Sequence, residues 1–147
     1  KTIEREMKEL IAADSNICRN YKLLTSIKGV GPITAIVMLC STLNFTKITD
    51  HRKFACYCGL APFEHSSGTS VRGGCHTSSM ANRDIKVQLN RRALIAIRCD
   101  PQLKAYYERK VAEGKHKFSV LNAVRAKIAA RCFAVVRRGT PYVALQI

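Results

Sequence analysis

The first 24 residues place apolar side chains at the spacing of a coiled-coil helix. Apolar positions recur at alternating steps of four and three residues, at Ile3, Met7, Leu10, Ile17, Tyr21 and Leu24, and Asp14 interrupts the series. Two interpretations are open: an amphipathic helix lying on its own domain, or the end of a coiled coil in which Asp14 weakens pairing or sets its register. We predict a helix over residues 1–22 and, through it, a homo-oligomer of two or more copies. The chain begins at Lys1 and not at Met, which we interpret as a piece of a longer protein.

A helix, a tight turn and a second helix are predicted over residues 23–44. Two glycines, Gly29 and Gly31, make the turn, and Pro32 suits the first position of the next helix. Such a turn exposes backbone N–H groups at a helix N-terminus, where they can bind a phosphate oxygen. The pattern resembles the helix-hairpin-helix motif of DNA-binding proteins, so Gly29, Gly31 and the neighbouring Lys28 are candidate nucleic-acid ligands. The alternative is an interhelical turn without a ligand.

Helical periodicity is also found in most of the remaining chain, over residues 49–58, 79–98, 101–113 and 117–138. Asp50 is a possible N-cap, Pro101 suits a helix start and Gly114 a helix stop. Residues 59–80 are rich in Gly and Ser, show no helical period and predict a long loop without strand pairing. The fold class is therefore mainly α: a compact helical domain over residues 23–147 with a helix-hairpin-helix-like motif and one long Gly/Ser-rich loop.

The charge of the chain points to a polyanionic partner. Its 147 residues, 47% of them hydrophobic, include 25 Lys and Arg against 10 Asp and Glu, a net charge of +15. Sixteen of the basic and five of the acidic residues follow residue 60. Arg72, Arg83 and Lys86 lie on or just after the Gly/Ser segment, and Arg91 follows them. We predict that these four bind nucleic acid; the alternative is a scatter of solvated charges.

Cysteine usage and hydropathy argue against a secreted or membrane protein. The seven cysteines are odd in number and mostly lie in apolar runs, which is typical of reduced, core-packed thiols in the cytoplasm. A zinc site at Cys56, Cys58, Cys75 and His76 is the less favoured alternative, because the C-x-C spacing is too short. No apolar stretch approaches the roughly 20 residues that span a bilayer.

Two further observations concern chemistry. Ser66 and Ser67 lie in the Gly/Ser segment, and a serine attacks a phosphoryl centre only when a base, a metal or positive charge activates it. From composition alone, serines of a flexible loop are the favoured interpretation. The ten acidic residues are spread along the chain, so the sequence predicts no metal site in it, and any magnesium ligands lie outside it.

Four segments taken together resemble a known family. They are Ser26–Pro32, Arg52–Pro62, His65–Gly68 and Ala81–Lys86. Their order and separation resemble the C-terminal transposase domain of the DEDD transposases of the IS-one-ten type, and the likeness runs from about Leu23 to Arg138. Two departures occur: Ala81 stands where glycine is usual, and Lys86 stands where arginine is common. Lys86 keeps the charge but loses the bidentate geometry of arginine.

The resemblance implies an activity and partners. In that family an N-terminal RuvC-like domain carries four acidic ligands for Mg²⁺, and a coiled coil leads to the domain seen here. The family's serine before glycine attacks a DNA phosphate in a composite site, and it corresponds to Ser67, or to Ser66 if the register is off by one. Expected partners are DNA and a structured non-coding RNA, in the bacterial cytoplasm near the nucleoid. The alternative is a non-catalytic helix-hairpin-helix module of a repair or recombination protein.

Overall fold

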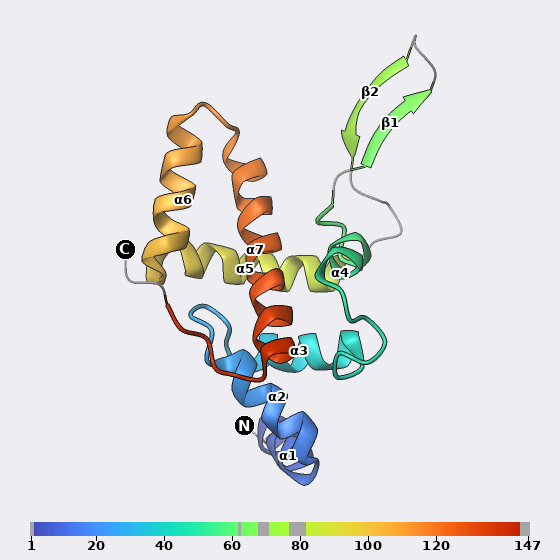
Figure 1. Cartoon of the computed structure of the whole chain (residues 1–147), viewed down its shortest axis with the longest axis vertical. Helices are drawn as coiled ribbons and strands as arrows, with labels where there is room; N and C mark the ends of the chain where they lie inside the picture. The colour runs from blue at the N-terminus through green and yellow to red at the C-terminus, as the bar shows by residue number, and fades with distance from the viewer. Residues whose placement is uncertain (1, 62, 68–70, 77–81, 145–147) are drawn as a thin grey trace.

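The chain folds into a mainly helical body from which one β-hairpin projects (Figure 1). A computed structural model describes residues 2–61, 63–67, 71–76 and 82–144, and for the hairpin it describes the backbone alone. The described elements are α1 (Thr2–Ala13), α2 (Ser15–Thr25), α3 (Pro32–Thr42), α4 (His51–Tyr57), β1 (Phe63–Ser67), β2 (Val71–His76), α5 (Arg83–Cys99), α6 (Pro101–Ala112) and α7 (Lys117–Arg138). The mainly α fold class is confirmed.

The hydrophobic core is built around α7. Its buried face includes Val124, Ile128 and Cys132, and it packs against α2, α4, α5 and α6. An aromatic cluster closes the end of the core near α4, where the Phe133 ring centroid lies 5.4 Å from that of Phe54 and 4.9 Å from that of Phe45. Because α7 contacts four other helices, it fixes the relative positions of the elements that carry the candidate site.

The N-terminal segment differs from the single helix predicted over residues 1–22. The chain breaks at Asp14, whose backbone is extended and whose Oδ1 accepts hydrogen bonds from the N–H groups of Asn16 at 2.8 Å and Ile17 at 3.0 Å. Asp14 is therefore the N-cap of α2, and the single continuous helix is a wrong prediction, whereas coiled-coil pairing stays a prediction. No residue of α1 is buried, and Ile3 and Leu10 are 67% and 74% exposed. Homo-oligomerisation through this segment stays a prediction.

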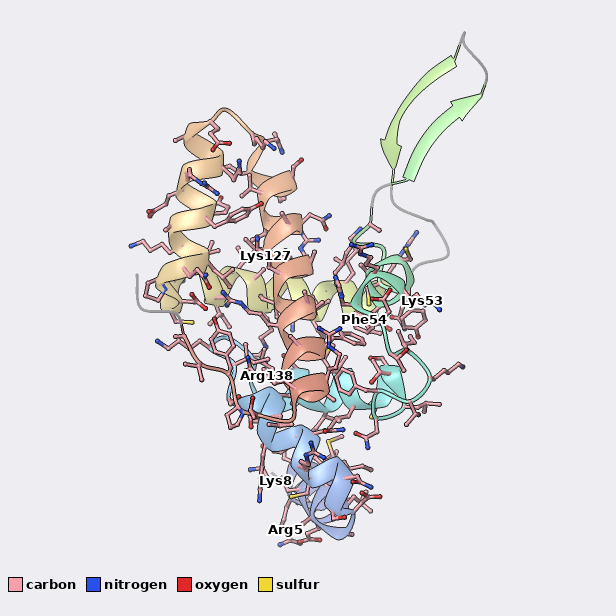
Figure 2. All side chains as sticks on the ribbon, in the orientation of Figure 1. Arg5, Lys8, Lys53, Phe54, Lys127 and Arg138 are labelled. Atoms are coloured by element: carbon pink, nitrogen blue, oxygen red, sulfur yellow. The ribbon has the colours of Figure 1, made fainter. Side chains whose placement is uncertain are left out.

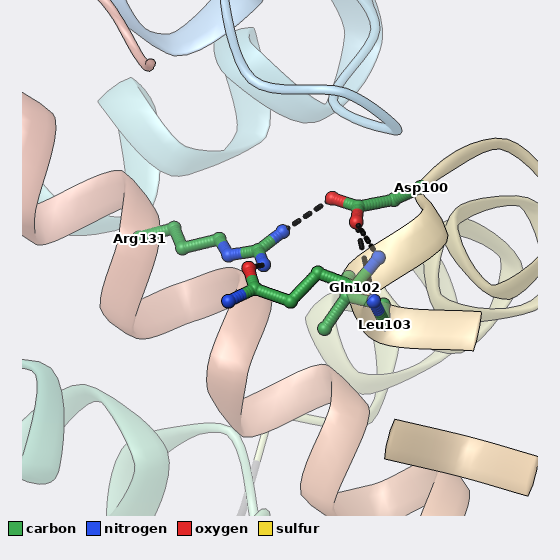
Figure 3. Close-up of polar contacts among 4 residues, drawn as sticks. All are labelled: Asp100, Gln102, Leu103 and Arg131. Atoms are coloured by element: carbon green, nitrogen blue, oxygen red, sulfur yellow. Dashed lines mark hydrogen bonds and ion pairs between the residues drawn. The ribbon is translucent and has the colours of Figure 1, made fainter. Parts of the chain in front are cut away.

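The corner between α5 and α6 is held by one buried carboxylate (Figure 3). Asp100 Oδ1 accepts from the N–H groups of Gln102 at 2.9 Å and Leu103 at 3.1 Å and so caps α6. Its Oδ2 accepts from Arg131 Nη1 of α7 at 2.6 Å, and Arg131 Nη2 donates to Gln102 Oε1. Asp100 thus joins α5, α6 and α7 at one point.

Cysteine alkylation tests the core. Burial raises the pKa of the Cys58 and Cys132 thiols to about 12, whereas Cys40 and Cys99 are exposed, unlike the core packing predicted for most cysteines. Iodoacetamide at pH 8 should modify Cys40 and Cys99 within minutes and leave Cys58 and Cys132 unmodified until the chain unfolds, because the thiolate is the reactive form. Peptide mass spectrometry measures this. Modification of Cys132 at the rate of Cys99 would contradict the packing of α7.

Candidate nucleic-acid interface

The segment predicted as a loop over residues 59–80 contains an antiparallel hairpin, so the absence of strand pairing expected there is wrong. The register pairs Phe63 with His76 and Glu64 with Cys75, then Ser66 with Arg72 and Ser67 with Val71. Between these pairs one residue of β1 faces two of β2, the glycines 73 and 74, so β2 is bulged. The backbone therefore places both candidate serines near the far end of β1, with Arg72 opposite Ser66. The side chains of Ser66, Ser67 and Arg72 lie outside the described part.

The root of the hairpin is anchored to the helical body from both sides. Asn82, which precedes α5, donates its backbone N–H to the Tyr57 carbonyl at 3.0 Å. Asn122 of α7 donates from Nδ2 to the Leu60 carbonyl at 2.7 Å. The Asn82 side chain also caps α5 by accepting from the N–H of Ile85 at 3.3 Å. These bonds bring the first turn of α5 and the second turn of α7 to the base of the hairpin.

One face of α5 is exposed and basic. The helix holds five basic residues and one acidic residue, Asp84. At about 100° per residue, Arg83, Arg91 and Arg98 fall on the face opposite the buried Leu89 and Ala96. Exposed Val87, Leu94 and Ile95 lie among these arginines. The result is an arginine stripe, spaced by about two helical turns, which suits contact with several phosphates along a nucleic-acid backbone.

The structure places the predicted ligands at two sites along α5. Three of them belong to the helix itself, and Lys28 belongs to the turn that packs on its other end. Arg83 is exposed and Lys86 half-buried at the hairpin end, and Arg91 is exposed in the middle. Arg98 completes the stripe but was not predicted as a ligand; its signal was its spacing of seven residues from Arg91. The exposed Lys28 belongs to the turn that packs on the other end of α5, about 20 Å from Arg83 at 1.5 Å per residue.

The glycine turn packs directly on α5. Gly29 has φ +89°, and a Cβ there would lie 3.0 Å from Ala96 Cβ. A Cβ at Gly31 would lie 3.2 Å from Arg92 Nη1. The left-handed backbone and the close approach of Ala96 account for Gly29, whereas the atom near Gly31 is the end of a flexible arginine side chain. Phosphate binding by this turn stays a prediction. As predicted, Pro32 occupies the first turn of α3.

A buried cation lies at the hairpin root. Arg125 of α7 is 8% exposed, and its Nη1 lies 3.5 Å from Oδ1 of Asn122, the residue that binds the Leu60 carbonyl. No carboxylate of the described residues forms an ion pair with Arg125, and desolvation lowers its pKa. A buried charge without a counterion is costly, so an anion bound near the hairpin root would stabilise Arg125. Sequence reasoning placed Arg125 in the basic half and assigned it no role.

The described residues contain no cluster of metal ligands. No group of three His, Cys, Asp or Glu side chains in that part of the chain is placed to hold an ion. The residues described here therefore do not fit a Mg²⁺ ion, which the resemblance assigned to a domain outside this chain. The zinc site considered as an alternative would use Cys56, which is half-buried, and Cys58, which is buried. Its other two residues, Cys75 and His76, have side chains outside the described part of the chain. No described helix is both long and apolar enough to cross a membrane.

Comparison with known proteins identifies the family. Residues 21–108, which include α3, α4, the hairpin and α5, match the model of the Transposase IS116/IS110/IS902 family. The chain belongs to this transposase family. The resemblance drawn from the four sequence segments is thereby confirmed, and the family match contains both the hairpin and the arginine stripe.

Individual relatives agree with this transposase family. The chain is 38% identical over 121 residues to the insertion element IS110 uncharacterized 43.6 kDa protein of Streptomyces coelicolor, covering 82% of this chain and 29% of that protein. It is 23% identical over 141 residues to the pilin gene-inverting protein of Moraxella bovis, covering 95% and 44%. It is 28% identical to the insertion element IS900 uncharacterized 42 kDa protein of Mycobacterium paratuberculosis, covering 86% and 35%. The chain spans less than half the length of these relatives.

Proposed function

We propose that this chain is the DNA-binding, catalytic-serine domain of a transposase that cuts and rejoins DNA when a mobile element moves. The observation that carries the proposal is the combination at the hairpin: two serines and Arg72 on paired strands, above a root that gathers Arg83, Lys86 and Arg125. The names of the relatives, an insertion-element protein and a gene-inverting protein, agree with DNA rearrangement.

The proposed chemistry is transesterification at phosphorus. The Ser67 hydroxyl oxygen attacks the scissile phosphate, its proton is lost, and one deoxyribose oxygen leaves as a hydroxyl. The P–O bond to that deoxyribose breaks as the P–O bond to serine forms, so the number of phosphodiester linkages is unchanged. A hydroxyl of a second DNA end then attacks the phosphoserine, its P–O bond to serine breaks, and the Ser67 oxygen takes up a proton, which restores the serine. Arg72, which the register places opposite Ser66, stabilises the charge that develops on the phosphate oxygens, and the cations at the hairpin root hold the neighbouring polynucleotide backbone. Ser66 takes this role if the register is off by one.

The site is proposed to be composite. The described part of this chain offers no carboxylate cluster for Mg²⁺, so we derive no step through a metal ion here. The resemblance assigns the metal ligands to a RuvC-like domain outside this chain, from the same or another subunit. A structured RNA that pairs with DNA belongs to the same proposal, since the α5 stripe suits either polynucleotide.

Charge removal from α5 tests nucleic-acid binding. The variant Arg83→Gln/Arg91→Gln/Arg98→Gln should bind a fluorescein-labelled duplex at least about tenfold more weakly, and the slope of log K against log salt should fall by about 2.7. Fluorescence anisotropy of the 147-residue chain over a salt series measures both quantities.

The matched control removes cations far from the hairpin. Arg5 and Lys8 lie on α1, at the opposite end of the molecule (Figure 2), and Arg5 pairs with the exposed Glu9. Arg5→Gln/Lys8→Gln should leave the affinity within about twofold. A fall of about 1.8 in the salt slope of the control, in proportion to its two lost charges, would show that only net charge matters and would contradict the stripe. The non-catalytic alternative retains binding but predicts full recombination activity for Ser67→Ala in the full-length protein.

A further inference from the structure

A second basic surface lies between α6 and α7, which run side by side as a helical hairpin (Figure 1). A groove of about 580 Å³ separates their side chains, and its walls carry Arg109 from α6 together with Lys127 and Arg131 from α7. Lys127 is labelled on α7 where that helix faces α6 (Figure 2). Among the residues that the structure describes, no acidic side chain lines the groove. Its volume is that of sites which take small ligands or single units of a polymer, roughly 300–1,000 Å³.

Two of the three cations meet at one aromatic ring. Lys127 Nζ lies 4.4 Å and Arg109 Cζ 5.9 Å from the centroid of Tyr106, which also lines the groove. Lys127 has no ion pair with any carboxylate of the described residues. Arg109 has one, to the exposed Glu113 at 3.9 Å, which solvent screens strongly. Two like charges beside one ring repel each other, and an anion between them would relieve that repulsion.

The third cation forms a fixed wall. Arg131 is held by Asp100 and Gln102 (Figure 3), and its Cζ lies 5.0 Å from the Tyr142 ring centroid. Asp100 balances its charge, so the positive excess of the groove resides on Lys127 and Arg109. The Arg131 guanidinium is therefore held in place before a ligand binds, which lowers the entropic cost of binding.

We propose that the α6–α7 groove binds a single-stranded segment of nucleic acid, separate from the polynucleotide on the α5 stripe. Cations that bind phosphates and an aromatic ring that stacks on a base are the usual elements of a single-strand site, and the Tyr106 ring becomes available to a base when Lys127 and Arg109 turn from it to the phosphates. The proposal rests on the proposed function. A domain that holds DNA while another polynucleotide is present needs a second nucleic-acid site, and the groove would be that site. None of the groove residues named above belongs to the hairpin or to the stripe.

The test combines charge removal with a fluorescent reporter. The chain contains no tryptophan, so Tyr106→Trp introduces a single indole in the groove. The probe is a fluorescein-labelled oligo-dT of twelve nucleotides. Lys127→Gln/Arg109→Gln should bind it about tenfold more weakly, with a salt slope smaller by about 1.4 for two single-strand phosphates. Unlabelled oligo-dT should quench the fluorescence of the introduced indole, and the quenching should be lost when the two cations are also replaced.

The matched control is Lys104→Gln/Lys115→Gln, which removes two exposed charges that do not line the groove. It should bind as the parent chain does. Two results together would overturn the groove site and leave binding on α5 intact. Lys127→Gln/Arg109→Gln would keep the affinity and salt slope of the parent chain, and oligo-dT would not quench the indole of Tyr106→Trp. Equal binding of thymidine monophosphate and oligo-dT would also overturn it, because the ligand would be a free nucleotide. A parent chain that binds neither duplex nor oligo-dT would overturn the proposed function as well.

Discussion

Replacing Asp100 by alanine is expected to lower the free energy of unfolding by about 3–5 kcal/mol. The Asp100 and Arg131 side chains are only 4% and 15% exposed, and their ion pair measures 2.6 Å. Removal of the carboxylate leaves the guanidinium largely buried without a counterion and also removes the N-cap of α6. Chemical denaturation of the 147-residue chain, followed by circular dichroism, measures the loss.

Two variants give this prediction its controls. Asp100→Asn retains an oxygen that can accept from the N–H groups of Gln102 and Leu103 but removes the charge, so its loss should lie between those of parent and alanine variant. Glu9→Gln removes one partner of a solvent-exposed pair with Arg5 and should leave stability almost unchanged. A loss below about 1 kcal/mol for Asp100→Ala would show that this corner does not hold α5, α6 and α7 together.

Replacing Ser67 by alanine in the full-length transposase is expected to reduce recombination by roughly 10⁴-fold or more, as removal of a covalent nucleophile does in other enzymes. The substitution deletes one oxygen and keeps the backbone, so the hairpin register and DNA binding should persist. The rate of joined-product formation, measured under single-turnover conditions, gives the activity. Anisotropy with the same DNA shows that binding is retained.

Ser66→Ala is the matched control, since it removes the same atom from the neighbouring residue of β1. Its rate should stay within a few-fold of the parent. If Ser66→Ala is inactive and Ser67→Ala active, the nucleophile is Ser66. If both single variants and the double variant recombine DNA at the parent rate, water or a DNA hydroxyl attacks the phosphate, and the domain binds nucleic acid without covalent catalysis.

Local sequence signals located the helices of the body well. Pro32 and Pro101 mark the starts of α3 and α6, and Gly114 follows the end of α6 in a left-handed conformation. The break at Asp14 was missed because the apolar spacing continues through it. Periodicity reports which face is apolar, whereas an N-cap depends on one side-chain bond to the backbone. Asp100 caps α6 in the same way, and there Pro101, which follows it, indicated the helix start in the sequence.

The candidate site was only partly accessible to sequence reasoning. Segment order and basic charge indicated residues 59–80 as the candidate site and Arg83 as a candidate ligand. Glycine and serine carry little strand propensity, so the pairing of residues 63–67 with 71–76 was not predicted. Arg125 was missed for a different reason. A cation in an apolar helix gives no signal of its burial until α7 is packed against the hairpin root, and that packing depends on contacts distant in sequence.

The most direct test of the account is to trap the covalent intermediate. The full-length transposase is incubated with DNA carrying its element ends, Mg²⁺ and any associated RNA, quenched in denaturant, digested, and examined by peptide mass spectrometry. If Ser67 is the nucleophile, we expect a nucleotide phosphate joined to the peptide that contains Ser67. Fragmentation should locate it on that residue, and it should be absent from Ser67→Ala. Cleaved DNA without any protein–DNA adduct, or an adduct on a residue outside the hairpin, would contradict it.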